Sequence, residues 1–236
     1  MEFSKEQKKF INEFVIEINN GDAAIFAGAG LSAAAGFINW KELLRDLAEE
    51  INLEIEKEYD YVAIAQYHFN KFKRGKINDK IVNQFTSLSR GTANHKILSR
   101  IGIETFWTTN YDQLIEKSLE DEGKTVELKI RNEDFSRNIK KKDAIVYKMH
   151  GDKKSPDEAI LTKDDYDSYN DKRELFSTAL RGDLLSKTFL FLGFSFDDPN
   201  LDYVMSRIKI LLGDNTPTHF CFLKKVNEKD YEPEFD

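Results

Sequence analysis

The chain has 236 residues, and its 35 lysines and arginines against 42 aspartates and glutamates give a formal net charge of −7. This acidic balance argues against general nucleic-acid binding, which needs a positively charged face. Hydrophobic residues make up 40% of the chain, enough for a full core, so the composition excludes general disorder. The N-terminus is charged and no apolar run approaches the length of a membrane span, so we expect neither a signal peptide nor a membrane partner.

The cysteine count limits the chemistry further. Cys221 is the single cysteine, which excludes an internal disulfide framework and a multi-cysteine zinc site. No spacing of histidines and acids resembles a metal site either, so we expect no metal cofactor. A chain of this kind fits a reducing compartment, and we expect it to be cytoplasmic.

Six short apolar runs have the β-branched and aromatic content of buried strands. In chain order they are Ala23–Ala27, Ile103–Thr109, the weaker Val126–Ile130, Ala144–Met149, Thr188–Leu192 and His219–Leu223. Helical patterns lie between them, and this alternation predicts an α/β fold with a Rossmann-like parallel sheet. Several runs are apolar almost continuously, which is expected when helices cover both faces of the sheet.

The helices carry recognisable start signals. Ser4 and Gln7 have the spacing of a capping box ahead of an amphipathic stripe, and Asp198 with Pro199 predicts a second helix start. The stretch from about 59 to 98 contains no convincing strand and predicts two or three helices. We therefore expect one domain over residues 1–236, with a small helical module inserted at roughly 55–100. The acidic end after Val226 has no predicted element, so we expect the sequence to be a piece of a longer chain.

A glycine-rich segment follows the first predicted strand. The strand ends at Ala27 and is followed by Gly28, Ala29, Gly30 and Ser32 at the start of a predicted helix. Glycines in this position let the backbone approach a pyrophosphate, and the amides of a helix N-terminus favour an anion. The alternative is a tight turn with close helix packing.

The segment after these glycines argues against an ordinary dehydrogenase. Such an enzyme would have a second strand ending in an acid about 20 residues after the glycines, to hold a ribose. Here residues 41–51 have the spacing of an amphipathic helix, and Glu49 and Glu50 lie at the right distance but on that helix.

Three further polar clusters follow predicted strands: Thr108–Asp112, His150–Asp152 and Gly193–Ser195. The carboxyl ends of parallel strands lie at one edge of a sheet, so these clusters should meet the glycine segment in one crevice. This convergence predicts a nucleotide site. His150 is the one histidine at such a strand end and can accept a proton near neutral pH. We interpret the other histidines, and Cys221, as structural.

Together these motifs resemble those of the sirtuin family. Residues 28–40 are similar to its G-A-G-x-S and G-I-P-D-F-R segment, Thr109–Asp112 to its Q-N-x-D motif, His150-Gly151 to its catalytic H-G, and Gly193–Ser195 to its later G-x-S. The surrounding residues resemble, more closely still, the sirtuin-like effectors of bacterial Thoeris antiphage defence, which consume NAD. The four-cysteine zinc module of sirtuin deacylases is missing here, so the resemblance puts the acyl-lysine groove in doubt.

The resemblance implies an NAD glycohydrolase that cleaves the nicotinamide–ribose bond of its substrate NAD. It implies that His150 is a general base and that Asn110 orients water or the ribose. The implied NAD-binding residues are Ala27, Gly28, Ala29, Gly30, Ser32, Asp112, Gly193, Phe194 and Ser195. Among these, Asp112 would hold the nicotinamide side, with capping of the next helix as its alternative role.

Two other functions stay open at this point. One is NAD-dependent protein deacylation in the same pocket, and the other is a catalytically silent module that binds NAD or ADP-ribose. The resemblance further implies a homo-oligomer, and a C-terminal regulatory domain that binds a cyclic ADP-ribose signal in full-length members. Neither can be read from the residues themselves.

Overall fold

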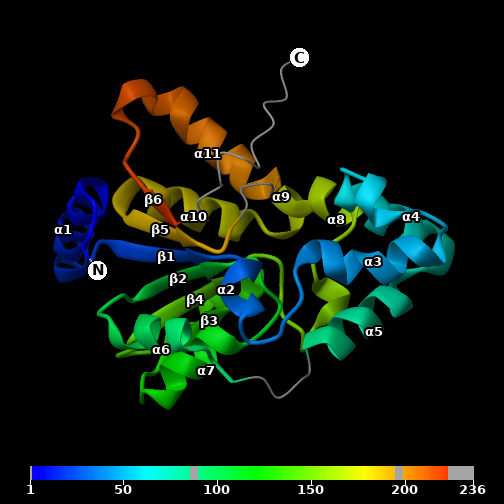
Figure 1. Ribbon diagram of the computed structural model, residues 1–236, viewed down its shortest axis with the longest axis horizontal. Helices are drawn as coiled ribbons and strands as arrows, with labels where there is room; N and C mark the ends of the chain where they lie inside the picture. The colour runs from blue at the N-terminus through cyan, green and yellow to red at the C-terminus, as the bar shows by residue number, and fades with distance from the viewer. Residues whose placement is uncertain (1, 86–89, 195–198, 223–236) are drawn as a thin grey trace.

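The computed structural model describes residues 2–85, 90–194 and 199–222. Its centre is a sheet of six parallel strands in the order β3-β4-β2-β1-β5-β6 (Figure 1). The strands are β1 (Ala23–Ala27), β2 (Thr105–Thr108), β3 (Val126–Lys129), β4 (Ala144–Lys148), β5 (Thr188–Leu192) and β6 (Phe220–Phe222). All six predicted strands are confirmed, with ends that differ by up to two residues; the predicted end of the last one, Leu223, lies outside the described residues.

Helices cover both faces of the sheet, as predicted. One face carries α1 (Lys5–Asn20), α6 (Ala93–Arg100) and α7 (Leu114–Asp121); the other carries α9 (Tyr169–Lys172), α10 (Glu174–Ser186) and α11 (Pro199–Leu212). Side chains of β1 alternate between the two layers, because successive residues of a strand point to opposite faces. Ile25 packs with the first layer and Phe26 with the second.

The local signals of the sequence explain where the helices start. The predicted capping box of α1 is present: the Gln7 amide donates to Ser4 Oγ at 3.2 Å, and the Ser4 amide donates to Gln7 Oε1 at 2.9 Å. Helix α11 begins at Pro199 as predicted, while its expected cap, Asp198, lies outside the described residues. Among the described residues, no helix is long and apolar enough to cross a membrane.

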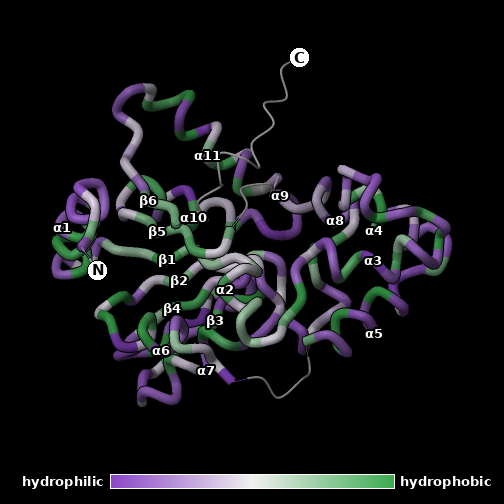
Figure 2. Tube along the Cα trace, viewed as in Figure 1, coloured by the Kyte–Doolittle hydropathy of each residue, from purple (hydrophilic) through white to green (hydrophobic). Residues whose placement is uncertain are grey.

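A group of helices lies beyond the carboxyl edge of the sheet and has its own core. It contains α3 (Trp40–Glu50), α4 (Tyr61–Phe72) and α5 (Arg74–Phe85), and α8 (Lys163–Asp167) lies against α4. Figure 2 shows hydrophobic and hydrophilic stretches alternating along α3, α4 and α5. Helix α6 instead joins the sheet, since Leu98 packs in the same cluster as Phe106 of β2. The module therefore comprises α3 to α5 and does not extend to residue 100.

Strand order places the ends of three strands side by side. The last residue of β1, Ala27, is paired with Thr108 of β2 on one side and with Leu192 of β5 on the other. Strands β2, β3 and β4 lie on one side of β1, whereas the later strands β5 and β6 lie on its other side. The strand order therefore reverses at β1. Ligands of open α/β sheets bind in the crevice at such a reversal.

Candidate active site

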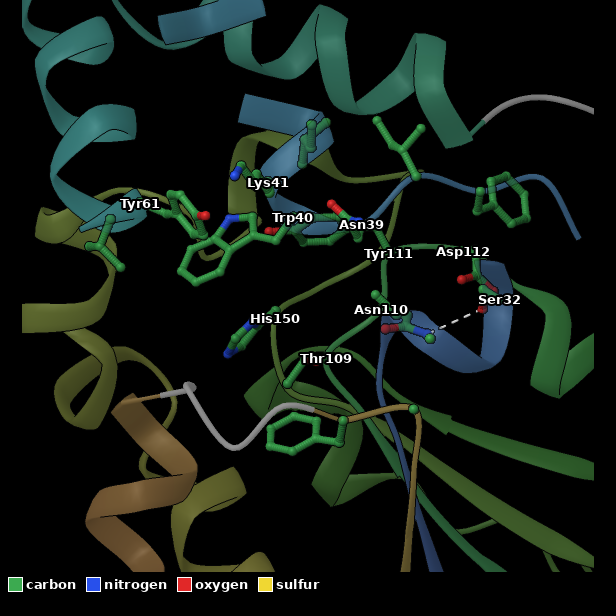
Figure 3. Close-up of a pocket in the computed structure, with 18 of the residues that line it drawn as sticks. Ser32, Asn39, Trp40, Lys41, Tyr61, Thr109, Asn110, Tyr111, Asp112 and His150 are labelled. Atoms are coloured by element: carbon green, nitrogen blue, oxygen red, sulfur yellow. Dashed lines mark hydrogen bonds between the residues drawn. The ribbon is translucent and has the colours of Figure 1, made fainter. Parts of the chain in front are cut away.

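A cavity of about 930 Å³ lies between this edge of the sheet and the helical module. Eight of the predicted site residues line it: Ala29, Gly30, Ser32, Asn110, Asp112, His150, Gly193 and Phe194. They come from segments that follow β1, β2, β4 and β5, so the structure brings together residues more than 160 positions apart. Figure 3 shows Asn110 and His150 between an aromatic side of the cavity and the side of Ser32 and Asp112.

Two of the predicted residues that the structure describes do not line the cavity. Ala27 and Gly28 are buried, and their carbonyl oxygens accept hydrogen bonds from Thr108, the last residue of β2, and from Asn110, which follows it. Ser195 lies outside the described residues. The proposed NAD-binding roles of all these positions stay predictions.

The glycine segment, which includes the short helix α2 (Ala29–Ala33), is packed closely against the turn after β5. The Gly28 amide donates to Leu192 O and the Gly30 amide to Gly193 O, each at 2.9 Å. A Cβ on Gly28 would overlap the Gly193 carbonyl oxygen, and one on Gly30 would lie 2.8 Å from Gly193 Cα. Close packing is therefore one reason for these glycines, and their two amides are not available to a phosphate. The Ala29 amide is the remaining candidate in this segment, because the Ser32 amide already lies within the hydrogen-bonded turn of α2.

Asn110 is fixed by a continuous set of hydrogen bonds. Its Nδ2 donates to Gly28 O at 3.0 Å and to Ser32 Oγ at 3.2 Å (Figure 3). Its main-chain amide donates to Thr108 Oγ1 at 3.0 Å, and that hydroxyl donates to Ala27 O at 2.8 Å. Both amide hydrogens are thereby engaged, so the side-chain oxygen is the part of Asn110 left to accept a hydrogen bond from a ligand.

His150 follows β4 and is 5% exposed. Its ring meets Tyr166 edge to face, with centroids 5.5 Å apart, and Tyr169 at 6.3 Å. The chain turns sharply after it at Gly151, whose φ of +92° lies in the region that favours glycine. The Ile160 amide then donates to His150 O at 3.0 Å, which holds the loop back against the strand end.

Asp112 has two different carboxylate oxygens. Oδ1 accepts a hydrogen bond from the Leu114 amide at 2.9 Å, at the start of α7, but the N-cap residue of this helix is Gln113 and not Asp112. Oδ2 is buried and has no hydrogen-bond partner among the described residues, although Asp112 also lines the cavity. The carboxylate therefore supports the start of α7 from the position before the N-cap, and its proposed role toward NAD stays a prediction.

Sequence reasoning missed the aromatic side of the cavity. The Trp40 ring lies 6.0 Å from that of Tyr61 and 6.2 Å from that of Tyr166, between centroids. Trp40 and Tyr61 begin α3 and α4, and Tyr166 lies on α8. Tyr61 and Tyr166 carry no local motif, and only the packing of the module onto the sheet edge brings them to the site.

The structure can be compared with the features that a dehydrogenase and a metal-dependent enzyme would need. The region after the glycines is helix α3, so Glu49 and Glu50 lie on a helix, as expected, where a dehydrogenase would have the end of a second strand. No cluster of three or more histidine, cysteine or acidic side chains that could hold a metal ion is found in the part of the chain that the structure describes.

Comparison with known proteins gives several close relatives. Three proteins named "NAD(+) hydrolase ThsA" match: 51% identity over 235 residues in Acinetobacter baumannii (99% of this chain, 49% of the relative), 49% over 226 in Cytobacillus dafuensis (96% and 46%), and 48% over 229 in Bacillus cereus (96% and 48%). The chain thus spans about half the length of these curated relatives. A more distant match, 26% identical over 214 residues (87% of this chain, 21% of the relative), is "Defense-associated sirtuin 2" of Bacillus subtilis.

The family model for the SIR2-like domain matches residues 104–235, which is more than half of the chain. That match includes the strand ends that carry Asn110, His150 and Gly193. Together with the parallel sheet and the cavity at its carboxyl edge, it shows that the chain belongs to the SIR2-like domain family.

Proposed function

We propose that this chain is the catalytic part of an NAD glycohydrolase, which cleaves NAD into nicotinamide and ADP-ribose. The observation that carries the proposal is the placement of Asn110 and His150 in one cavity beside the glycine segment. Support comes also from four relatives, 44–51% identical, that are named NAD(+) hydrolases.

The cavity is suited to a dinucleotide in size and polarity. Its volume of about 930 Å³ lies within the range of about 300–1,000 Å³ for small-molecule sites. Ser32 and the turn at Gly193 lie at the glycine segment, where the phosphates would bind, and we assign the adenosine half to Gly193, Phe194 and Ser195. The aromatic side lies next to His150 and offers flat surfaces to a planar ring.

In the proposed mechanism the enzyme stabilises a positive centre and supplies water. Nicotinamide leaves NAD from a cationic form, so the leaving group needs no proton, and the ribose develops oxocarbenium character. Asn110 would accept a hydrogen bond from water or a ribose hydroxyl at Oδ1, since its Nδ2 is engaged by Gly28 and Ser32. His150 would take the proton that the attacking water loses.

The test is nicotinamide release from NAD by the purified chain and its variants. Asn110→Ala and His150→Ala should each lower kcat at least about 100-fold, as removal of a general base or orienting group does. Both variants should still fold, although the melting temperature of Asn110→Ala should fall because its two side-chain hydrogen bonds are lost. Asn12→Ala is a matched control, because Asn12 is exposed on α1. Turnover at the wild-type rate in both site variants would refute the assignment, and release of an acetyl group from an acetyl-lysine peptide would favour deacylation instead.

We also propose a biological setting. The activity would serve Thoeris-type antiphage defence in the cytoplasm, as a homo-oligomer whose C-terminal domain binds a cyclic ADP-ribose signal. The similarity to the relatives of about twice this length supports a further domain in the whole protein. Light scattering of the chain, and NAD loss in cells during phage infection, would test the two parts separately.

A further inference from the structure

Lys148 is a buried charge that the proposed mechanism does not use. It is the last residue of β4, two positions before His150, and its side chain is 0% exposed. It does not line the cavity. A buried ammonium is costly unless it is paired and hydrogen-bonded. Its Nζ lies 3.0 Å from Glu116 Oε1 and 2.6 Å from Asp152 Oδ2.

The same ammonium reaches the loop that carries Asn110. Nζ donates to the main-chain oxygen of Asp112 and lies 3.5 Å from that of Tyr111. These are the two residues directly after Asn110. One side chain on the His150 strand therefore holds the main chain of the Asn110 loop.

This contact begins where the sheet ends. β2 and β4 are paired up to Thr108 and Lys148, and the Met149 amide still donates to Thr108 O at 2.9 Å. Asn110 and His150 both lie past this last rung of the ladder. Their separation is therefore set by contacts between loops, of which the Lys148 ammonium makes several.

One of the two acidic partners of Lys148 ties the two loops together a second time. Asp152, which follows His150, accepts hydrogen bonds from Gln113 Nε2 at 3.0 and 3.2 Å and from the Lys154 amide at 2.9 Å. Gln113 belongs to the Asn110 loop. Burial alone would lower the pKa of Lys148, but the surrounding carboxylates outweigh it and raise that pKa, so the ammonium stays charged at neutral pH.

We propose that Lys148 is a positioning residue that fixes Asn110 relative to His150 through the main chain of Tyr111 and Asp112. It acts through these groups and touches no substrate. The kinetic test of this inference rests on the proposed function, because it measures kcat and KM for NAD cleavage. The rival explanation is that Lys148 only stabilises the fold, as any buried ion pair would.

Two variants separate these explanations. Lys148→Met keeps the volume of the side chain and removes the bonds to Tyr111 O and Asp112 O. Glu116→Gln weakens the same buried pair but leaves those two bonds in place. If Lys148→Met does not fold, the double variant Lys148→Met/Glu116→Gln replaces it. In the double variant Glu116 is no longer a buried carboxylate that has lost its ammonium partner.

The expected result is a kcat about 100-fold lower in Lys148→Met, as a misplacement near 1 Å costs. Its KM for NAD should stay within about threefold, because the residues proposed to bind the phosphates are untouched. Glu116→Gln should keep kcat within about threefold although its melting temperature also falls. Loss of kcat in both variants in proportion to their loss of stability would overturn the inference, as would unchanged kcat in Lys148→Met.

A second readout does not depend on the reaction. Amide hydrogen exchange of peptides covering 109–114 and 149–154 should accelerate in Lys148→Met at temperatures where the sheet stays protected, and not in Glu116→Gln. If the wild type releases no nicotinamide, the proposed function fails while this result still tests the role of Lys148. Equal exchange in the two variants would refute that role.

Discussion

At the scale of single residues, the site depends on acceptors for the Asn110 amide group. Ser32 Oγ and Gly28 O take both Nδ2 hydrogens, so the orientation of the side-chain oxygen is fixed by two bonds on the opposite side. Rotation of the amide would set its oxygen against the Gly28 carbonyl oxygen, which is unfavourable. A misplacement of such a group by about 1 Å can lower kcat about 100-fold. The same change removes only about 1 kcal/mol of folding stability for each hydrogen bond lost.

Removal of the Ser32 hydroxyl tests this dependence. We expect Ser32→Ala to lower kcat about tenfold, because Asn110 keeps one of its two acceptors, and to lower the free energy of unfolding by about 1 kcal/mol. Ser99→Ala is the matched control: Ser99 is 1% exposed and its hydroxyl donates to Lys96 O at 3.0 Å, within α6. It should show the loss of stability without the loss of kcat, measured by nicotinamide release and urea unfolding.

At the scale of elements, the turn after β5 and the glycine segment after β1 fit against each other with no room for a side chain. Gly193 has a φ of +62°, and a Cβ there would overlap the Leu31 amide nitrogen and lie 2.8 Å from Gly30 Cα. This fit aligns two walls of the cavity. It depends on the parallel pairing of β1 with β5, which brings Ala27 opposite Leu192.

A pair of glycine variants separates steric overlap from backbone strain. Gly193→Ala should lower the free energy of unfolding by more than about 2 kcal/mol, since overpacking adds to the cost of a positive φ. Gly213 has a φ of +53°, but a Cβ there would have no atom within 4 Å. Gly213→Ala should therefore lower the free energy of unfolding by about 1 kcal/mol and leave turnover unchanged. Urea unfolding and nicotinamide release measure both; equal effects of the two variants would contradict the steric argument.

The elements also show what could be predicted from sequence. The strands were predictable because a central parallel strand is buried on both faces, as β1 is along its whole length. The polar ends of β1, β2, β4 and β5 followed from that sheet. The limits of the helical module did not, because an amphipathic stripe shows that α6 is buried on one face but not which core it joins. The position of Tyr166 in the cavity beside His150 was not predictable, because it depends on how α8 packs against α4.

At the scale of the whole molecule, the cavity lies between two separate cores. Arg74 of α5 ties the helical module to the loop that follows β4: its guanidinium donates to Asp165 Oδ2 at 2.7 Å, to Pro156 O at 3.1 Å and to Ala159 O. These partners belong to the segment that follows His150. Burial acts to raise the pKa of Asp165, but Arg74 and nearby main-chain amides hold it below its usual value. This charged contact therefore holds α5 to the chain segment that follows His150.

The stability of the whole chain should also depend on pH through buried histidines. Burial lowers the pKa values of His95 and His219 below 6.5, so both stay neutral in the folded chain under conditions that protonate them when it is unfolded. The unfolded state then binds more protons, and this contribution to stability is complete above pH 6.5 and is lost as the pH falls below it. Each unit of lowered pKa is worth at most about 1.4 kcal/mol.

The measurement is urea unfolding at pH 7.5 and pH 5.5 for the wild type and for His95→Gln. Glu116 and Asp183 act in the opposite direction, because burial raises their pKa values and a folded state that holds their protons gains stability as the pH falls. The difference between the two chains removes this shared background. We expect the wild type to lose more stability on acidification than His95→Gln, and an equal loss would show that His95 does not titrate on unfolding in this range.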